Sequence, residues 1–204
     1  MNSIKNTRRI TGVAMLTALS VVFQVIGNLF TIGPVSINVS LIPIAMGAIL
    51  YGPLAGLFLG VINGLVVIFS PATQAVFFSQ APLWTIIICL TKTGLAGLIS
   101  GLVFKLFLNK SRTIMIIGMV ISSMLVPLIN TGIFFIAVMT AFKKILNTNG
   151  LSDAQFYATY FIAILPAFLS ELIVNILLAP TIISMIKIIT KKGDIGDNLE
   201  TFNK

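Results

Sequence analysis

Histidine is absent from this 204-residue chain, and cysteine and acidic residues are scarce. Without histidine the chain can form neither a histidine-based metal centre nor a Ser-His-Asp triad. The single cysteine, Cys89, lies in an apolar segment without partners for an internal disulfide or a metal site, so we expect it to serve packing. The HExxH motif and the paired carboxylates of membrane proteases are also missing. The sequence therefore predicts no enzymatic activity, no metal and no cofactor.

Two further absences concern nucleotides and nucleic acids. The chain has no G-x-x-x-x-G-K-S/T loop, so it cannot power transport with a P-loop of its own. Its net charge of +8 is strongly basic, but no basic run is interleaved with aromatic residues as in a nucleic-acid surface. We expect no nucleic-acid partner, because the cytoplasmic flanks of membrane helices also collect lysine and arginine.

Long apolar runs are the feature that the chain does possess. Hydrophobic residues make up 57% of it and charged residues 9%, against about 25% charged residues in soluble domains. The runs cover residues 9–28, 41–51, 53–69, 83–108, 113–142 and 156–189. This pattern predicts an all-α integral membrane protein, with one six-helix domain over residues 1–190 and a polar cytoplasmic tail over residues 191–204.

Residues 41–51 are too few to cross a bilayer as a regular helix. They span roughly 17 Å of a hydrocarbon core about 30 Å thick. The extended segment before them, residues 29–40, must then supply the missing depth, and we expect it to cover a cavity.

The basic residues predict the orientation of the six helices. Ten of them fall on the side of the two termini, and only Lys143 and Lys144 fall on the other side. The positive-inside rule therefore places both termini in the cytoplasm. The loops over residues 29–40, 70–82 and 143–155 are then expected to face outward.

Small residues mark two kinds of helix contact. Glycines at every fourth position form one ridge, at Gly52, Gly56, Gly60 and Gly64, and a second set follows at Gly94, Gly97 and Gly101. Such residues let helices approach closely, so we expect packing inside the bundle. Ala14 and Ala18 are two small residues four positions apart on the first helix. This spacing suits either ordinary packing inside the bundle or docking of another membrane subunit.

Lys92 and Glu171 are charged residues within apolar runs. Charges facing lipid are costly, so we expect both side chains to face the bundle interior. They either form a structural ion pair or contact a polar ligand, and a Lys92 free of Glu171 would attract a carboxylate. Trp84, Tyr157 and Tyr160 begin two of the helices and suit an interfacial belt or the stacking walls of a pocket.

Several motifs follow one another in a definite order and spacing. The segment over residues 42–56 carries Pro43, Gly47, Gly52-Pro53 and Gly56, and Gly60 follows it. The last two helices add Pro127, Asn130, Thr131, Gly132, Glu171, Asn175 and Pro180. This series resembles the substrate-binding (S) components of energy-coupling factor (ECF) transporters, and Ala14 and Ala18 match the alanine motif of that family's first helix.

This resemblance implies a substrate-capture subunit in a bacterial cell membrane. It would bind a vitamin from outside and dock through Ala14 and Ala18 on a coupling membrane protein that works with two ATPases. The candidate cargo contacts are Asn38, Asn63, Trp84, Lys92, Asn130, Thr131, Glu171 and Asn175. Because Lys92 would suit an acid, we expect pantothenate as the cargo, with folate next.

Three other classes compete with this interpretation. A standalone secondary transporter could use Glu171 as its proton site. A membrane enzyme would need a catalytic constellation that we cannot assemble from these residues, and a purely structural membrane subunit is the third alternative. Co-purification with a coupling protein and two ATPases separates the first interpretation from the others.

Overall fold

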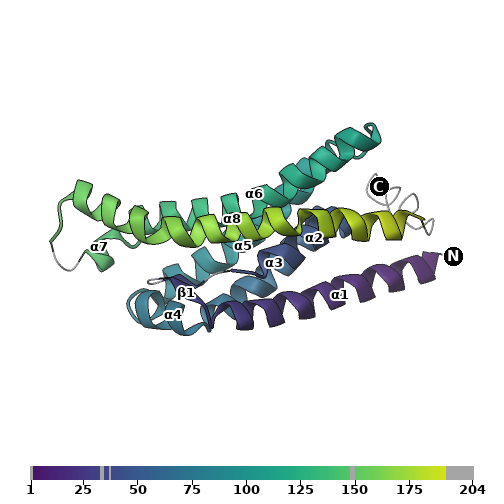
Figure 1. Cartoon of the computed structure of the whole chain (residues 1–204). Helices are drawn as coiled ribbons and strands as arrows, with labels where there is room; N and C mark the ends of the chain where they lie inside the picture. The colour runs from purple at the N-terminus through teal and green to yellow at the C-terminus, as the bar shows by residue number, and fades with distance from the viewer. Residues whose placement is uncertain (1, 33–34, 37, 148–149, 192–204) are drawn as a thin grey trace.

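The computed structural model describes residues 2–32, 35–36, 38–147 and 150–191, and long helices dominate it (Figure 1). They are α1 (Asn2–Gly27), α2 (Leu41–Tyr51), α3 (Pro53–Ile68), α5 (Pro82–Lys105), α6 (Arg112–Met139) and α8 (Asp153–Lys191). The helical segments expected from the apolar runs are thus confirmed, with ends shifted by a few residues. The expected tail lies outside the described residues beyond Lys191.

Short elements connect the long helices. Strands β1 (Thr31–Ile32) and β2 (Val35–Ser36) form an antiparallel hairpin within the segment expected to be extended. Between α3 and α5 lie α4 (Pro71–Thr73) and the π-helix η1 (Gln74–Phe78). The four-residue helix α7 (Lys143–Leu146) follows α6, so the predicted loop over residues 143–155 is partly helical.

Four of the helices are long and apolar enough to cross a membrane. These segments are Asn6–Gly27, Pro82–Lys105, Thr113–Met139 and Asp153–Ile176. A fifth span results if α3 and the segment Pro71–Phe78, which are bent by 63° relative to each other, are counted as one. Helix α2 has only 11 residues, nine of them buried, and forms the centre of the apolar core. Six complete spans and the orientation of the termini stay predictions.

The expectation of a loop over residues 70–82 was wrong, because α4 and η1 make this segment helical. Ser70 begins α4 as an N-cap and accepts a hydrogen bond from the Thr73 amide at 3.3 Å. Pro71 occupies the first helical turn, where its missing N–H costs nothing. The Gln74 side chain donates to the Ile68 carbonyl at 2.6 Å and ties the bend together. The Ser-Pro pair is thus a helix start rather than a loop signal.

The glycine ridge on α3 packs against α5, as its spacing predicts. A Cβ on Gly60 would lie 2.6 Å from the Thr93 carbonyl carbon, and one on Gly101 would lie 2.6 Å from the Cα of Pro53. These neighbours are backbone atoms, so they cannot move aside as a side chain would. Close backbone contact therefore holds α5 against α3 and brings the polar face of α5 into the bundle.

The two ends of the bundle differ in what they carry. The start of α1 and the end of α8 lie at one end, and the hairpin, α4 and α7 lie at the other (Figure 1). At the second end, Lys143 binds the Asp153 carboxylate at 2.7 Å and donates to the Tyr157 hydroxyl at 3.2 Å. The Asp153 bond, followed by the Tyr157 bond, raises the pKa of Lys143 above its ordinary value.

A single added methyl group tests the α3–α5 contact. Gly60→Ala should lower the stability of the detergent-purified protein by about 1–3 kcal/mol, because the methyl group must push two helix backbones apart. Gly132→Ala on α6 is the matched control, since nothing lies within 4 Å of a Cβ at Gly132. Thermal unfolding of both variants measures the effect, and equal melting temperatures for the two would contradict the contact.

Candidate functional site

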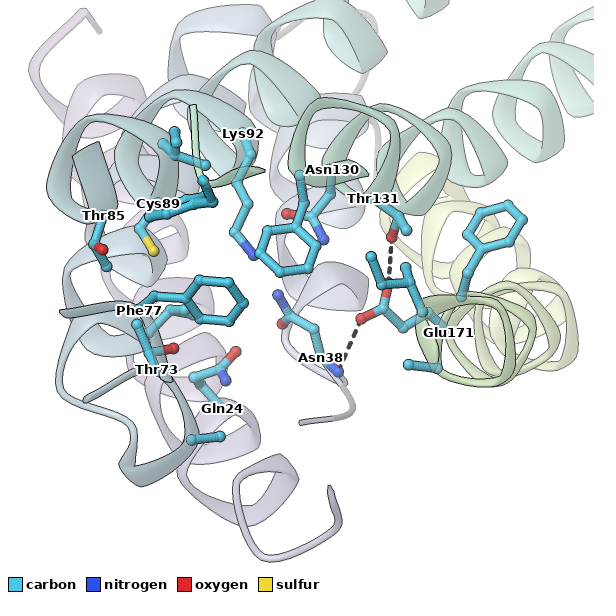
Figure 2. A pocket seen from close by; sticks show the side chains of 18 residues that line it. Gln24, Asn38, Thr73, Phe77, Thr85, Cys89, Lys92, Asn130, Thr131 and Glu171 are labelled. Atoms are coloured by element: carbon cyan, nitrogen blue, oxygen red, sulfur yellow. Dashed lines mark hydrogen bonds between the residues drawn. The ribbon is translucent and has the colours of Figure 1, made fainter. Parts of the chain in front are cut away.

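A narrow cavity of about 50 Å³ lies among α1, α5, α6 and α8 and is lined by many polar side chains (Figure 2). We call it the polar chamber. Its polar lining consists of Gln24, Asn38, Thr73, Thr85, Lys92, Asn130, Thr131 and Glu171. Asn38 belongs to the segment before α2 and Thr73 to α4, so connecting segments as well as long helices contribute walls.

Glu171 joins three parts of the chain at the chamber. Its side chain is 4% exposed, and one carboxylate oxygen accepts the Asn38 backbone N–H at 3.2 Å. The other oxygen accepts the Thr131 hydroxyl at 3.0 Å (Figure 2). A buried carboxylate is costly without such donors, so these bonds stabilise both the charge and the position of the Asn38 segment.

Lys92 enters the chamber from α5 and is 9% exposed (Figure 2). Its ammonium nitrogen lies 4.9 Å from the centre of the Phe134 ring, a cation–π distance. Lys92 and Glu171 both belong to the described part of the chain, and no salt bridge joins them although both line the chamber. The expectation that both charges face the interior is confirmed, and the ion-pair alternative is not observed.

Several amides of the chamber are linked, and one retains an unpaired acceptor. The Ser40 hydroxyl lies within hydrogen-bond distance of both the Gln24 and the Asn38 side-chain oxygens, and Gln24 donates to Asn28 at 2.9 Å. Among the described residues, the side-chain oxygen of Asn130 has no partner although the residue is 3% exposed. A buried acceptor in this state gains from any donor that a bound molecule brings.

Aromatic rings form the apolar part of the chamber wall. Phe77 of η1 packs edge-to-face against Phe134, with ring centres 5.4 Å apart, and against Phe142 at 5.1 Å. All three rings line the chamber. They belong to a cluster with the buried residues Val138 and Phe156, which lies toward the end of the bundle with α4 and α7.

Five of the eight predicted cargo contacts meet in the chamber, namely Asn38, Lys92, Asn130, Thr131 and Glu171. The other three predicted contacts do not line it. Asn63 is fully buried on α3, and Trp84 is 50% exposed on the outside of α5, which suits a membrane-interface residue rather than a stacking wall. Asn175 donates its amide to the Glu171 backbone carbonyl at 2.9 Å, one turn along α8. We therefore do not include Asn63, Trp84 and Asn175 among the proposed cargo contacts.

The sequence analysis did not identify Gln24, Phe77, Thr85 and Phe134 as chamber residues. Gln24 had a usable signal, because it is an amide on an otherwise apolar stretch of α1. Phe77 and Phe134 had none, since phenylalanine is common in membrane helices. Cys89 packs against Val67 and Ile68, as expected, and also forms part of the chamber wall.

The chain matches the model of one known protein family. A family model described as "ECF transporter, substrate-specific component" matches residues 8–183. No curated protein and no solved structure gave a match.

Removing the Glu171 carboxylate should release the Asn38 segment. In Glu171→Leu the Asn38 N–H loses its acceptor, a loss of about 1–3 kcal/mol, so its hydrogen exchange should accelerate about 5- to 150-fold. Exchange at this amide is the appropriate measurement, because removing a buried charge offsets part of the effect on global stability. Thr131→Val is the control, since it leaves the Asn38 bond in place. Unchanged Asn38 exchange in Glu171→Leu would contradict the role of the carboxylate.

Proposed function

We propose, from the premise that this chain belongs to the family of ECF transporter substrate-specific components, that it captures a small polar nutrient in the polar chamber. The observation that carries this proposal is a pair of buried polar groups in one cavity of an apolar helical bundle. Within the described chain, the Lys92 ammonium has no hydrogen bond or salt bridge, and the side-chain oxygen of Asn130 has no hydrogen-bond partner. Such groups are costly without partners, and a bound polar molecule would supply them.

Components of this family bind substrate and work with a module made of a coupling membrane protein and ATPases. We propose that this chain works with two ATPases in a bacterial cell membrane. The chamber would open outward, because the Asn38 segment and η1 contribute walls at the end opposite the start of α1. The excess of basic residues near the termini supports this orientation.

The surface proposed to dock on the coupling protein is the face of α1 around Ala14 and Ala18. Both residues are exposed and lie one helical turn apart, so their small side chains leave room for a partner helix. The bulkier exposed residues Met15 and Leu19 border this face. It suits close packing against another membrane helix better than a continuous row of large side chains would.

The cargo proposed from the sequence is pantothenate, with folate next, because Lys92 attracts a carboxylate. The competing function is a standalone secondary transporter that uses Glu171 as a proton site. This alternative is supported by the surroundings of Glu171, which is buried and has no salt bridge to Lys92 within the described chain.

Bulky substitutions on α1 test the docking proposal. Ala14→Trp and Ala18→Trp should abolish co-purification with a coupling protein and two ATPases, because an indole cannot fit between closely packed helices. Cargo binding by the purified chain should not change, since neither residue lines the chamber. Pull-down followed by subunit identification, alongside a binding titration, measures both effects.

Ile162→Trp provides the matched control, because Ile162 is 68% exposed on α8. It should leave co-purification intact. Uptake into vesicles that lack any ATPase, driven by a proton gradient, would instead support the secondary transporter and would reject the S-component proposal.

A further inference from the structure

The chamber has an anion-attracting wall at Lys92. Lys92 is 9% exposed, its ammonium makes no hydrogen bond or salt bridge to the described chain, and the ammonium lies 4.9 Å from the centre of the Phe134 ring. A cation–π contact offsets part of the cost of burying a cation, but a carboxylate offsets more of it. Glu171 attracts Lys92 but forms no salt bridge with it, because its oxygens accept hydrogen bonds from Asn38 and Thr131 instead.

The facing wall is rich in hydrogen-bond acceptors. Each oxygen of Glu171 accepts one bond from the protein, whereas a carboxylate has about four acceptor positions in total. The side-chain oxygen of Asn130 adds an acceptor without a partner in the described chain. These groups favour hydroxyl or amide N–H donors on the part of a ligand that lies away from its acid group.

The apolar wall argues against a large flat ring. Phe77 meets Phe134 and Phe142 edge-to-face, with interplanar angles of 76° and 63°. The Phe134 face is already covered by the Lys92 ammonium. Among the described residues, these ring contacts provide no parallel pair of faces between which a fused ring system could stack.

We propose that the cargo is a small aliphatic carboxylic acid that carries hydroxyl or amide donors. Its carboxylate binds Lys92 and its donor end binds Glu171 and Asn130. This inference rests on the proposed function and deepens it, because it assigns an orientation and separates pantothenate-like acids from folate. A cationic vitamin is disfavoured by repulsion from Lys92, and a flat neutral vitamin leaves Lys92 unpaired.

A pair of ligands that differ only at the acid group tests the Lys92 end. Panthenol has a hydroxymethyl group where pantothenate has its carboxylate. In calorimetric titrations of the full-length purified chain, pantothenate should bind about 10- to 100-fold more tightly than panthenol, because the charged hydrogen bond is lost with the acid group.

Two variants then separate the two ends of the ligand. Lys92→Met should weaken pantothenate to the level of panthenol and leave panthenol unchanged, which also shows that the variant is folded. Glu171→Gln should weaken both ligands alike, because it acts on the donor end that they share. Lys105→Met, at an exposed position at the end of α5, is the control and should change neither affinity.

Further probes distinguish failure of this inference from failure of the proposed function. Equal affinity for pantothenate and panthenol, or tighter binding of folate, thiamine or riboflavin than of pantothenate, would overturn the substrate class. So would the lack of binding to both pantothenate and the smaller hydroxy acid pantoate. In each of these cases co-purification with the coupling protein and ATPases would still uphold the S-component function, and its absence would reject that function separately.

Discussion

The buried carboxylate of Glu171 is the constraint on which the chamber depends. In a bundle surrounded by lipid it must find donors inside the protein, and it takes them from Asn38 and Thr131. These two bonds join α8 to α6 and to the segment that follows the hairpin. Lys92 supplies the opposite charge from α5 without contacting the carboxylate, so the two charges remain available on separate sides of one cavity.

Helix α1 connects this chamber to the proposed docking surface. Gln24 lines the chamber and lies near Ser40, which also approaches Asn38, so a chain of polar groups leads from α1 to Glu171. Ala18 lies six residues earlier on the same helix, about 9 Å along its axis. Helix α1 is packed mainly against α2 and α3, which leaves the face with Ala14 and Ala18 exposed. Helix α1 thus carries a residue that lines the chamber and a residue of the proposed docking surface less than two turns apart.

Much of the fold could be predicted because apolar runs and Gly-Pro breaks are local signals. The Gly52-Pro53 break separates α2 from α3 as expected, and the glycine ridge correctly predicts close helix packing. Lys92 and Glu171 could be located because a charge in lipid must turn inward. Trp84 was predicted to contact cargo but does not line the chamber, and Phe77 lines it without having been predicted. The rotation of a helix about its axis decides whether a ring faces lipid or a cavity. That rotation depends on contacts between distant segments, which local patterns do not contain.

The geometry of Glu171 also bears on how transport is energised. A proton-coupled carrier needs a carboxylate that changes partners as it gains and loses its proton. Both oxygens of Glu171 accept hydrogen bonds from groups on other elements, and these bonds hold the carboxyl group in one position. Breaking these bonds would release the Asn38 segment and leave the buried Asn38 amide without its acceptor, at a cost of about 1–3 kcal/mol, and the partly buried Thr131 hydroxyl would lose its acceptor as well. A carboxyl group fixed by two elements suits the proposed substrate-capture subunit, energised by a coupling module, better than the competing proposal that Glu171 changes partners during proton transfer.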